Sequence, residues 1–344
     1  MLQSVKLTNF RNFKTKSFKF SSKVTVIVGP NASGKTNILE SIGLLSTGKS
    51  FKARVSEEMI NYESEIARVA SDGLEIVLTR GVIKRGNMEE RTARKRFLIN
   101  GVGKRMMDFA GILKTVIFRP ADLDLVTESP SIRRNFLDTV LSQVDYRYRQ
   151  SLSTYEKGLR RRNKLLQAIR EGETSRSALY FWNNLLIKNG DYVTRKRADL
   201  IDFINKTEPM NDVNYTLEYD RSVISNSRLD QYKREEIAAG TTLVGPHRDD
   251  FCFIAKSRDL SKYGSRGEQR MGVLWLKLSE LTFIEKETDE KPLLLLDDIF
   301  SELDHEHRDL VQGLLNQQQT IMTTADMHFV EDLQKFAKIE LEGV

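Results

Sequence analysis

Residues 26–37, with the sequence VIVGPNASGKTN, decide the fold of this chain. An apolar run ends at Gly29, and a helix-forming stretch begins after Gly34. This is the strand–G-x-x-x-x-G-K-S/T–helix pattern of a P-loop. Its glycines let backbone N–H groups curl around phosphate oxygens, and the positive end of the following helix faces the same anion. The pattern therefore predicts a phosphate-binding turn rather than an ordinary βα connection.

Individual positions of the P-loop have predicted roles. Lys35 is expected to reach the β- and γ-phosphates as a catalytic cation, and the Thr36 hydroxyl is expected to bind Mg²⁺. The other positions expected to contact the nucleotide are Gly29, Pro30, Asn31, Ala32, Ser33, Gly34 and Asn37. Ala32 stands where a glycine is common, a mild change that should preserve phosphate binding.

Composition narrows the class of protein. The chain has 344 residues, of which 40% are hydrophobic, so two lobes with a sizeable core are expected. Cys252 is the single cysteine and only four histidines occur, which argues against a disulfide framework and a cysteine- or histidine-built metal site. The sequence has no apolar run of about 18 residues, so we expect a cytoplasmic protein without a membrane partner. A net charge of +6 suggests a polyanionic partner.

The segments before and after the P-loop alternate apolar and polar residues with the period of two that is typical of strands. Two strands joined by a turn at residues 9–13, NFRNF, are expected first. Arg11 in this turn is either a solvated charge or a phosphate contact, and the spacing leaves both open. Residues 65–105 predict a β meander with a hairpin at Asn100–Gly101. Eight cations against two glutamates make the end of this meander either a solvated strand face or a DNA-facing surface: Lys84, Arg85, Arg91, Arg94, Lys95, Arg96, Lys104 and Arg105.

Helical spacing replaces the strand pattern from about residue 121. Two long helices are expected on either side of a turn at residues 172–175, and Arg160, Arg161, Arg162 and Lys164 cluster on the first. Alternation returns at residues 213–219, where the chain is expected to re-enter a sheet. The predicted organisation is an N-terminal part of the P-loop lobe at 1–120, an inserted helical lobe at 121–210 and a C-terminal part of the P-loop lobe at 211–344.

A second strong motif is KPLLLLDDIFSELD, residues 291–304. Four leucines are typical of a buried parallel strand, and the carboxyl ends of such strands are where ligands of open α/β sheets gather. We assign Asp297 to Mg²⁺ and Asp298 to the orientation or deprotonation of the attacking water. An acidic helix cap is the alternative, and it fits Asp304 better than a pair that ends a leucine run.

The third motif, SRGEQ at residues 265–269, opens an amphipathic helix. Ser265, Gly267 and the N–H groups at the helix start can form an anion site. Taken alone, the motif is also compatible with an ordinary N-cap.

In this order, several segments resemble the RecF family of DNA repair proteins across nearly the whole chain. They are LTNFRNF, GPNASGKTNILESI, GKSF, FRPADLDLVTESPSIRRNFLD, LVGPHRDDF, SRGEQR and LLLLDDIFSELD. The resemblance implies an α/β ABC-type P-loop ATPase head with an inserted, mainly helical lobe, related to the heads of SMC proteins. A very long coiled coil, as in SMC proteins, is missing from the sequence.

The resemblance also implies a function. ATP and Mg²⁺ would be the cofactors, and a slow ATPase would form an ATP-dependent homodimer in which Ser265 and Gly267 of one subunit cover the γ-phosphate of the other. DNA would be bound at gaps and at double-strand/single-strand junctions, with RecR and RecO as partners in loading RecA. Two other classes stay open: a head-like interaction module that never hydrolyses ATP, and a metabolic P-loop kinase.

One position departs from the family pattern, and one block of residues has no derived role. Ala325 stands where related heads have a switch histidine, and His328 is nearby but misplaced. In GPHRDD, His247 and Arg248 contact nucleotide or DNA, or else the block is a tight turn stabilised by Asp249; both readings stay open.

Overall fold

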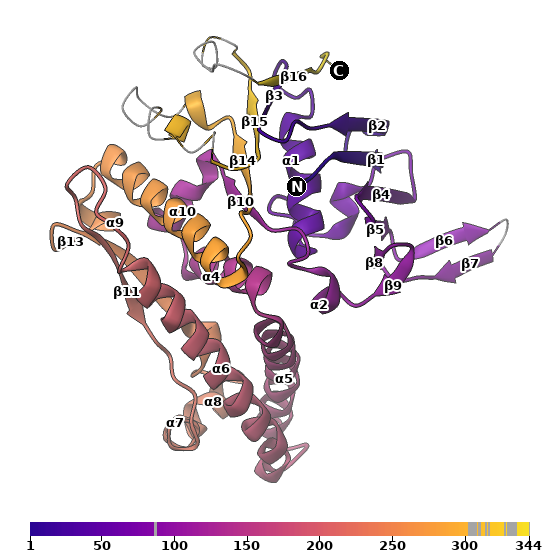
Figure 1. Cartoon of the computed structure of the whole chain (residues 1–344). Coiled ribbons are helices and arrows are strands. Elements are labelled where there is room, and N and C mark those ends of the chain that lie inside the picture. The colour runs from indigo at the N-terminus through magenta and orange to yellow at the C-terminus, as the bar shows by residue number, and fades with distance from the viewer. Residues whose placement is uncertain are drawn as a thin grey trace. The chain divides into compact units, whose positions relative to one another are not determined.

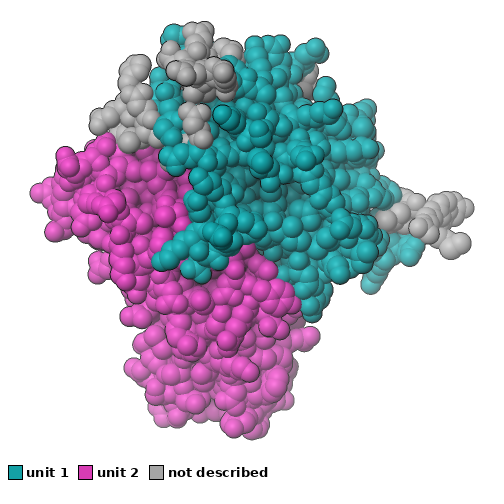
Figure 2. Space-filling view, viewed as in Figure 1, with its two compact units in different colours: residues 1–122, 284–344 teal, residues 123–283 magenta. Residues whose placement is uncertain are grey.

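A computed structural model of the chain describes residues 1–85, 88–301, 308, 311–313, 315, 317–326, 328 and 336–343. Its contacts divide it into two compact units, coloured separately in Figure 2. Unit 1 comprises residues 1–122 and 284–344, and unit 2 comprises residues 123–283. Unit 2 interrupts unit 1 and runs to Phe283, because the strands after residue 210 pack on its helices. The division of the chain at residues 120 and 210 stays a prediction.

Unit 1 contains a parallel sheet, an antiparallel sheet and a small hairpin (Figure 1). Its strands are β1 Ser4–Phe10, β2 Phe13–Lys19, β3 Val24–Val28, β4 Ile66–Ser71, β5 Leu74–Thr79, β6 Val82–Arg85, β7 Met88–Arg91, β8 Lys95–Ile99, β9 Val102–Lys104, β10 Thr115–Phe118, β14 Leu293–Asp297, β15 Thr320–Thr324 and β16 Ala337–Glu340. Its helices are α1 Lys35–Thr47 and α2 Met106–Phe109. The hairpin of β6 and β7 interrupts the expected meander, whose predicted turn at Asn100–Gly101 joins β8 to β9 with positive φ at both residues.

The five-stranded sheet, in the order β10-β14-β15-β3-β16, positions the site. Every neighbouring pair in it is parallel. The leucine run forms β14, whose five residues are all buried, as expected for a parallel strand covered on both faces. Because parallel strands end at one edge, the P-loop after β3 and the acidic pair after β14 meet at the same edge of this sheet.

Helix α1 packs between the parallel sheet and the six-stranded sheet, whose order is β2-β1-β4-β5-β8-β9. The shared core contains Leu7 and Ile76 from the antiparallel sheet, Ile38 and Leu39 from α1, and Leu295 from β14, all essentially inaccessible to solvent. The helix ends where Gly48 adopts a left-handed conformation. The packing of α1 on both sheets fixes the start of the helix, which is the end that faces phosphate in a P-loop.

Unit 2 consists of helices around a three-stranded sheet, β11-β12-β13. Its strands are β11 Tyr215–Asp220, β12 Asp250–Ala255 and β13 Arg258–Asp259, and its helices are α3 Asp124–Thr127, α4 Pro130–Val144, α5 Tyr146–Arg170, α6 Tyr180–Ile204, α7 Asn226–Gln231, α8 Lys233–Ala239, α9 Leu260–Tyr263 and α10 Arg266–Thr288, which continues into unit 1. The two long helices, α5 and α6, pack side by side and are joined by the predicted turn (Figure 1). Among the helices in the described part of the chain, none is both long and apolar enough to cross a membrane.

Candidate nucleotide-binding site

The P-loop wraps the start of α1 in the conformation that phosphate binding requires. Gly34 has φ 102°, and a Cβ there would lie 2.7 Å from atoms of Asn12 and Phe13, so only glycine fits. Ala32 has φ 65°, in the left-handed region where a glycine would be unstrained. The loop therefore keeps its shape despite the alanine, at a modest local cost in backbone strain.

Two polar side chains of the loop, Lys35 and Ser33, indicate how it would receive a phosphate. The Lys35 ammonium group donates to the carbonyl oxygens of Gly29 at 2.6 Å and Pro30 at 3.0 Å. The Ser33 hydroxyl is buried, and no hydrogen-bond partner for it exists among the described residues. A buried hydroxyl without a partner is costly. A phosphate oxygen in the loop would supply one, so the residues present fit a bound phosphate.

Thr36 and Asp297 bring the two predicted metal-binding side chains together. The Thr36 hydroxyl donates to Asp297 Oδ1 at 2.8 Å, and the Thr323 hydroxyl on β15 donates to the same oxygen at 2.9 Å. Asp297 is buried at the end of β14. Hydroxyl and carboxylate oxygens are the ligands that Mg²⁺ prefers. Because this ion usually keeps several of its waters, two protein ligands are enough for a site.

Asp298 follows in a conformation that is rare for residues other than glycine. Its φ is 52°, and its backbone N–H donates to the Thr323 hydroxyl at 3.0 Å and to the Thr323 carbonyl at 3.2 Å. Asp298 is only partly buried. Left-handed residues held by their surroundings cluster at functional sites, where the strain aims a side chain.

A cavity of about 230 Å³ joins these groups. It is lined by Asn31, Ala32, Gly34, Lys35, Thr36, Asn37, Lys52, Asp297 and Asp298. Most of the predicted P-loop residues and both aspartates thus surround one space. Lys52, which directly follows the GKSF segment, was not among the predicted site residues; its Nζ donates to Asn37 Oδ1 at 3.1 Å. The site therefore holds a second cation beside Lys35.

Arg11 points elsewhere. Its guanidinium binds both carboxylate oxygens of the fully buried Glu40 in α1, at 2.8 and 2.7 Å, and donates to the Glu58 carbonyl at 2.6 Å. The residue beside it, Asn12, reaches the P-loop instead, with Nδ2 donating to the Ser33 carbonyl at 3.2 Å and Oδ1 accepting from Asn37 at 2.9 Å. Arg11 is not among the residues that line the cavity. Its role as a nucleotide contact stays a prediction.

Ser265 and Gly267 lie exposed at the start of α10. Ser265 forms a reciprocal cap with Glu268: its N–H and hydroxyl donate to the Glu268 carboxylate at 2.9 and 3.1 Å, and the Glu268 N–H donates back to the hydroxyl at 3.3 Å. These contacts to Ser265 lower the pKa of Glu268. The motif is therefore a helix cap in this structure, and its exposure leaves it accessible to a second molecule.

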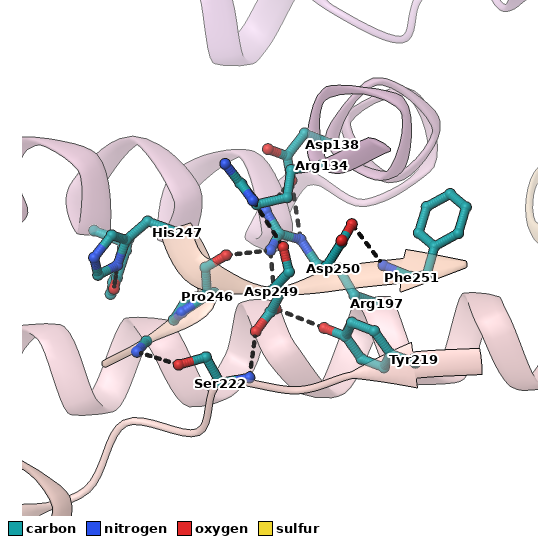
Figure 3. Close-up of polar contacts among 12 residues, drawn as sticks. Arg134, Asp138, Arg197, Tyr219, Ser222, Pro246, His247, Asp249, Asp250 and Phe251 are labelled. Atoms are coloured by element: carbon teal, nitrogen blue, oxygen red, sulfur yellow. Dashed lines mark hydrogen bonds and ion pairs between the residues drawn. The ribbon is translucent and has the colours of Figure 1, made fainter. Parts of the chain in front are cut away.

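The GPHRDD block forms a tight turn held by Asp249 (Figure 3). Asp249 is fully buried and accepts from Arg197 at 3.0 Å, from the Tyr219 hydroxyl at 2.6 Å and from the Ser222 N–H at 2.8 Å. Burial opposes the charge of Arg197, but Tyr148, Asp138 and Asp249 more than compensate and raise its pKa well above the usual value. This geometry favours the second of the two readings of the block, a turn stabilised by Asp249.

His247 belongs to the same interior. One ring nitrogen lies 2.7 Å from the Tyr155 hydroxyl and the other 3.0 Å from the Thr242 carbonyl. Burial, aided by the neighbouring arginines, lowers the pKa of His247 to about 4. The imidazole is neutral at pH 7 and cannot serve as a cation toward phosphate. A Cβ at Gly245 would lie 2.3 Å from the Tyr155 hydroxyl, so this turn also requires glycine.

The expected basic surfaces are only partly available. Arg162 is 2% exposed and donates to Glu236 at 2.7 Å, so it does not belong to the surface cluster predicted on α5. Arg160, Arg161 and Lys164 are exposed. In the meander, Arg91, Arg96 and Lys104 are exposed, whereas Arg94 pairs with Glu57 and Arg105 with Asp108.

Lys95 is withdrawn from the meander surface, because it donates to the Gly48 carbonyl and burial lowers its pKa to about 8. The side chains of Lys84 and Arg85, and residues 302–304 of the SELD segment with Asp304, lie outside what the structure describes. Ala325 lies exposed after β15, and the His328 N–H donates to Asp326.

The chain is similar to known proteins over nearly its whole length. Residues 1–343 match the family model described as RecF/RecN/SMC N terminal domain. The DNA replication and repair protein RecF of Roseiflexus castenholzii is 36% identical, with 92% of this chain and 91% of that protein covered. RecF of Bacillus velezensis is 34% identical, with 96% and 94% covered.

Solved structures of RecF proteins and of an Smc head domain are also similar to this chain. The recombination mediator protein RecF of the RecFOR pathway, in a structure described as RecF-ATPrS, has a TM-score of 0.85 and 30% identity, covering 98% of this chain and 96% of that one. An Smc head domain from Pyrococcus furiosus, at TM-score 0.50 and 18% identity, shares the fold, with 99% and 93% covered. The fold and site therefore define an ABC-type ATPase head of the RecF and SMC class. Within that class, the chain belongs to the RecF family of DNA replication and repair proteins.

Proposed function

We propose that this protein is a slow, DNA-stimulated ATPase that dimerises on ATP and binds DNA at gaps and double-strand/single-strand junctions, helping to load RecA together with RecR and RecO. The observation that carries the nucleotide part is the Thr36–Asp297 contact, which joins the P-loop to the acidic strand at one cavity. A relative described as RecF-ATP, 28% identical and covering nearly the whole chain, supports ATP as the nucleotide.

In this proposal each residue of the cavity has a defined task. Lys35 leaves the loop carbonyls and binds the terminal phosphates, and Lys52 adds a second positive charge on the same side. Thr36 and Asp297 would hold Mg²⁺, which would neutralise phosphate charge when bound. Asp298, aimed by its left-handed backbone, orients the attacking water and accepts its proton.

Completion of the site requires a second copy of the chain. Ser265 and Gly267 are exposed on unit 2, at the start of a long helix whose N–H groups suit an anion. In the dimer, the Ser265 motif of one subunit would cover the γ-phosphate held by Lys35 of the other. Hydrolysis would then remove the phosphate that bridges the two heads, so the rate of hydrolysis would set the lifetime of the dimer.

DNA binding is proposed to be mainly electrostatic. Exposed cations on α5 and on the meander supply positive charge, and the sequence contains no recognised base-reading motif. Affinity should therefore fall steeply as salt rises, through counterion release, and show little dependence on base sequence.

The proposal is tested by sedimentation velocity with ATP, ADP or no nucleotide, each with and without gapped DNA. The expected result is a dimer with ATP but not with ADP or without nucleotide. The ATP-bound dimer should also bind DNA more tightly than the monomer does. Phosphate release measured in parallel distinguishes a hydrolysing switch from a module that only binds ATP. A monomer under all conditions, with no phosphate release, would contradict the proposal.

A further inference from the structure

The turn between α5 and α6 exposes two aromatic rings in succession. Tyr180 and Phe181, the first residues of α6, are 75% and 63% exposed. Leu179 before them is buried, and Phe181 rests edge-on against Trp182, with ring centroids 5.1 Å apart. In the described part of the chain, no other two consecutive large apolar side chains are this exposed. Single exposed apolar residues are ordinary, but two highly exposed aromatic residues in succession mark a candidate contact surface.

The helical hairpin that carries these rings is rich in exposed positive charge. Between residues 157 and 188 the exposed carboxylates are Glu171 and Glu173, whereas the exposed cations are Lys157, Arg160, Arg161, Lys164, Arg170, Arg176 and Lys188. The hydrogen bond of 2.8 Å from Arg162 to Asn183 fixes how α5 lies beside α6. It places the Arg160–Lys164 stretch of α5 level with the first turn of α6. The rings and the Arg160–Lys164 stretch therefore lie in the half of the helical hairpin next to its turn.

We propose that this surface, called here the arm tip, binds single-stranded nucleic acid. Its members are Tyr180, Phe181 and the seven exposed cations just given. Bases would stack on the two rings while the cations contact phosphates, the combination that single-strand binders use. Cations alone would suit duplex DNA or an acidic protein, but the bases of a duplex are already stacked on each other and offer no free face to a ring. The aromatic pair therefore favours an unpaired strand.

The inference rests on the proposed function and deepens it, since it assigns the single-stranded side of a junction to the arm tip. The chain contains only two tryptophans, Trp182 against the Phe181 ring and the buried Trp275. Bases stacked at the arm tip should therefore change the fluorescence of Trp182, and Trp182→Phe should remove that signal while leaving binding intact.

The test compares the full-length protein with a Tyr180→Ala/Phe181→Ala variant on oligothymidylate and on a blunt duplex of the same length. Loss of the rings should weaken single-strand binding at least about tenfold, since stacking on an aromatic side chain typically contributes that much. Duplex binding, ATP binding and dimerisation should be unchanged. Tyr62→Ala is the matched control, because Tyr62 is 99% exposed and lies in unit 1.

Salt dependence separates stacking from charge. The double alanine variant should keep the slope of log affinity against log salt. Arg160→Gln/Arg161→Gln should make that slope shallower by about one to two, which corresponds to one or two lost phosphate contacts. Unchanged single-strand affinity in the alanine variant, or a Trp182 signal that ignores saturating oligothymidylate, would overturn the inference. Those results would leave the proposed function intact if the parent protein still bound duplex DNA and dimerised with ATP.

Discussion

The Thr36 hydroxyl and Asp297 Oδ1 lie 2.8 Å apart although 261 positions separate them in the chain. They meet because β15 alone stands between β3 and β14 in the parallel sheet, and Thr323 on β15 donates to the same carboxylate oxygen. The candidate metal site is therefore preorganised by three neighbouring strand ends rather than assembled by the nucleotide.

Replacing Lys35 by methionine should weaken ATP binding and abolish ATP-dependent dimerisation while the fold survives. The side chain is of similar length, but the charge that would bind the terminal phosphates is gone. An ATP titration measures binding, and a circular dichroism spectrum of the same variant checks that it is folded. An unchanged ATP affinity would refute the P-loop assignment.

Asp298→Asn should bind ATP and accumulate as a dimer that hydrolyses slowly. Loss of a positioned general base typically lowers the rate by about 10²–10⁴-fold, whereas Asp297 still holds its place beside Thr36. Single-turnover phosphate release checks this. Hydrolysis at the parent rate would place the base elsewhere, with Glu302 and Asp304 as the next candidates.

Ser265→Arg should leave ATP affinity of the monomer nearly intact while dimerisation and hydrolysis fail together. The substitution blocks the close approach of a second head, and loss of the cap itself costs only about 0.5–2 kcal/mol of stability. Mixing Ser265→Arg with Lys35→Met subunits is the decisive control. One site of the mixed dimer unites two intact halves, so partial dimerisation should return; dimerisation of Ser265→Arg alone would refute the role in trans.

Asp249→Asn should lower the free energy of unfolding by about 3–5 kcal/mol, because it leaves the buried Arg197 with a weakened partner set. Asp250→Asn is the matched comparison: Asp250 pairs with Arg133 but is partly exposed, so a smaller loss is expected. Urea denaturation of both variants measures the difference. Equal losses would show that Asp249 does not hold the turn.

Stability should fall as pH decreases from about 6.5 to 4 through His247. Its pKa is about 4 in the folded chain and 6.5 unfolded, so in this window the unfolded state binds more protons and is favoured as pH drops. The full effect is about 3 kcal/mol. His247→Gln should remove this contribution, which is read as the difference between the two proteins in urea denaturation at pH 7 and pH 5. Parallel pH profiles would exclude it.

The sequence predicted those parts of the site that depend on local chemistry. Gly34, Lys35 and the acidic pair after four leucines follow from what a phosphate turn and a buried parallel strand require, and the structure places them around one cavity. Tertiary partners were not predictable in the same way. Arg11 and Asn12 are adjacent in one turn, and which of them reaches the P-loop depends on the buried Glu40 in α1. Similarly, Arg162 stands in a basic run whose other members are exposed, but it pairs with Glu236 in the interior.

The strand order of the parallel sheet also determines when its strands can pair during synthesis of the chain. Strand β3 lies near the start of the chain, and both of its neighbours, β15 and β16, are made of residues beyond 319. During translation at about 5–20 residues per second, unit 2 is complete and contiguous while β3 still has no partner strand. The nucleotide cavity is thus among the last features to form on the ribosome. A nascent chain that stops short of β15 carries the whole P-loop sequence without the sheet that shapes it.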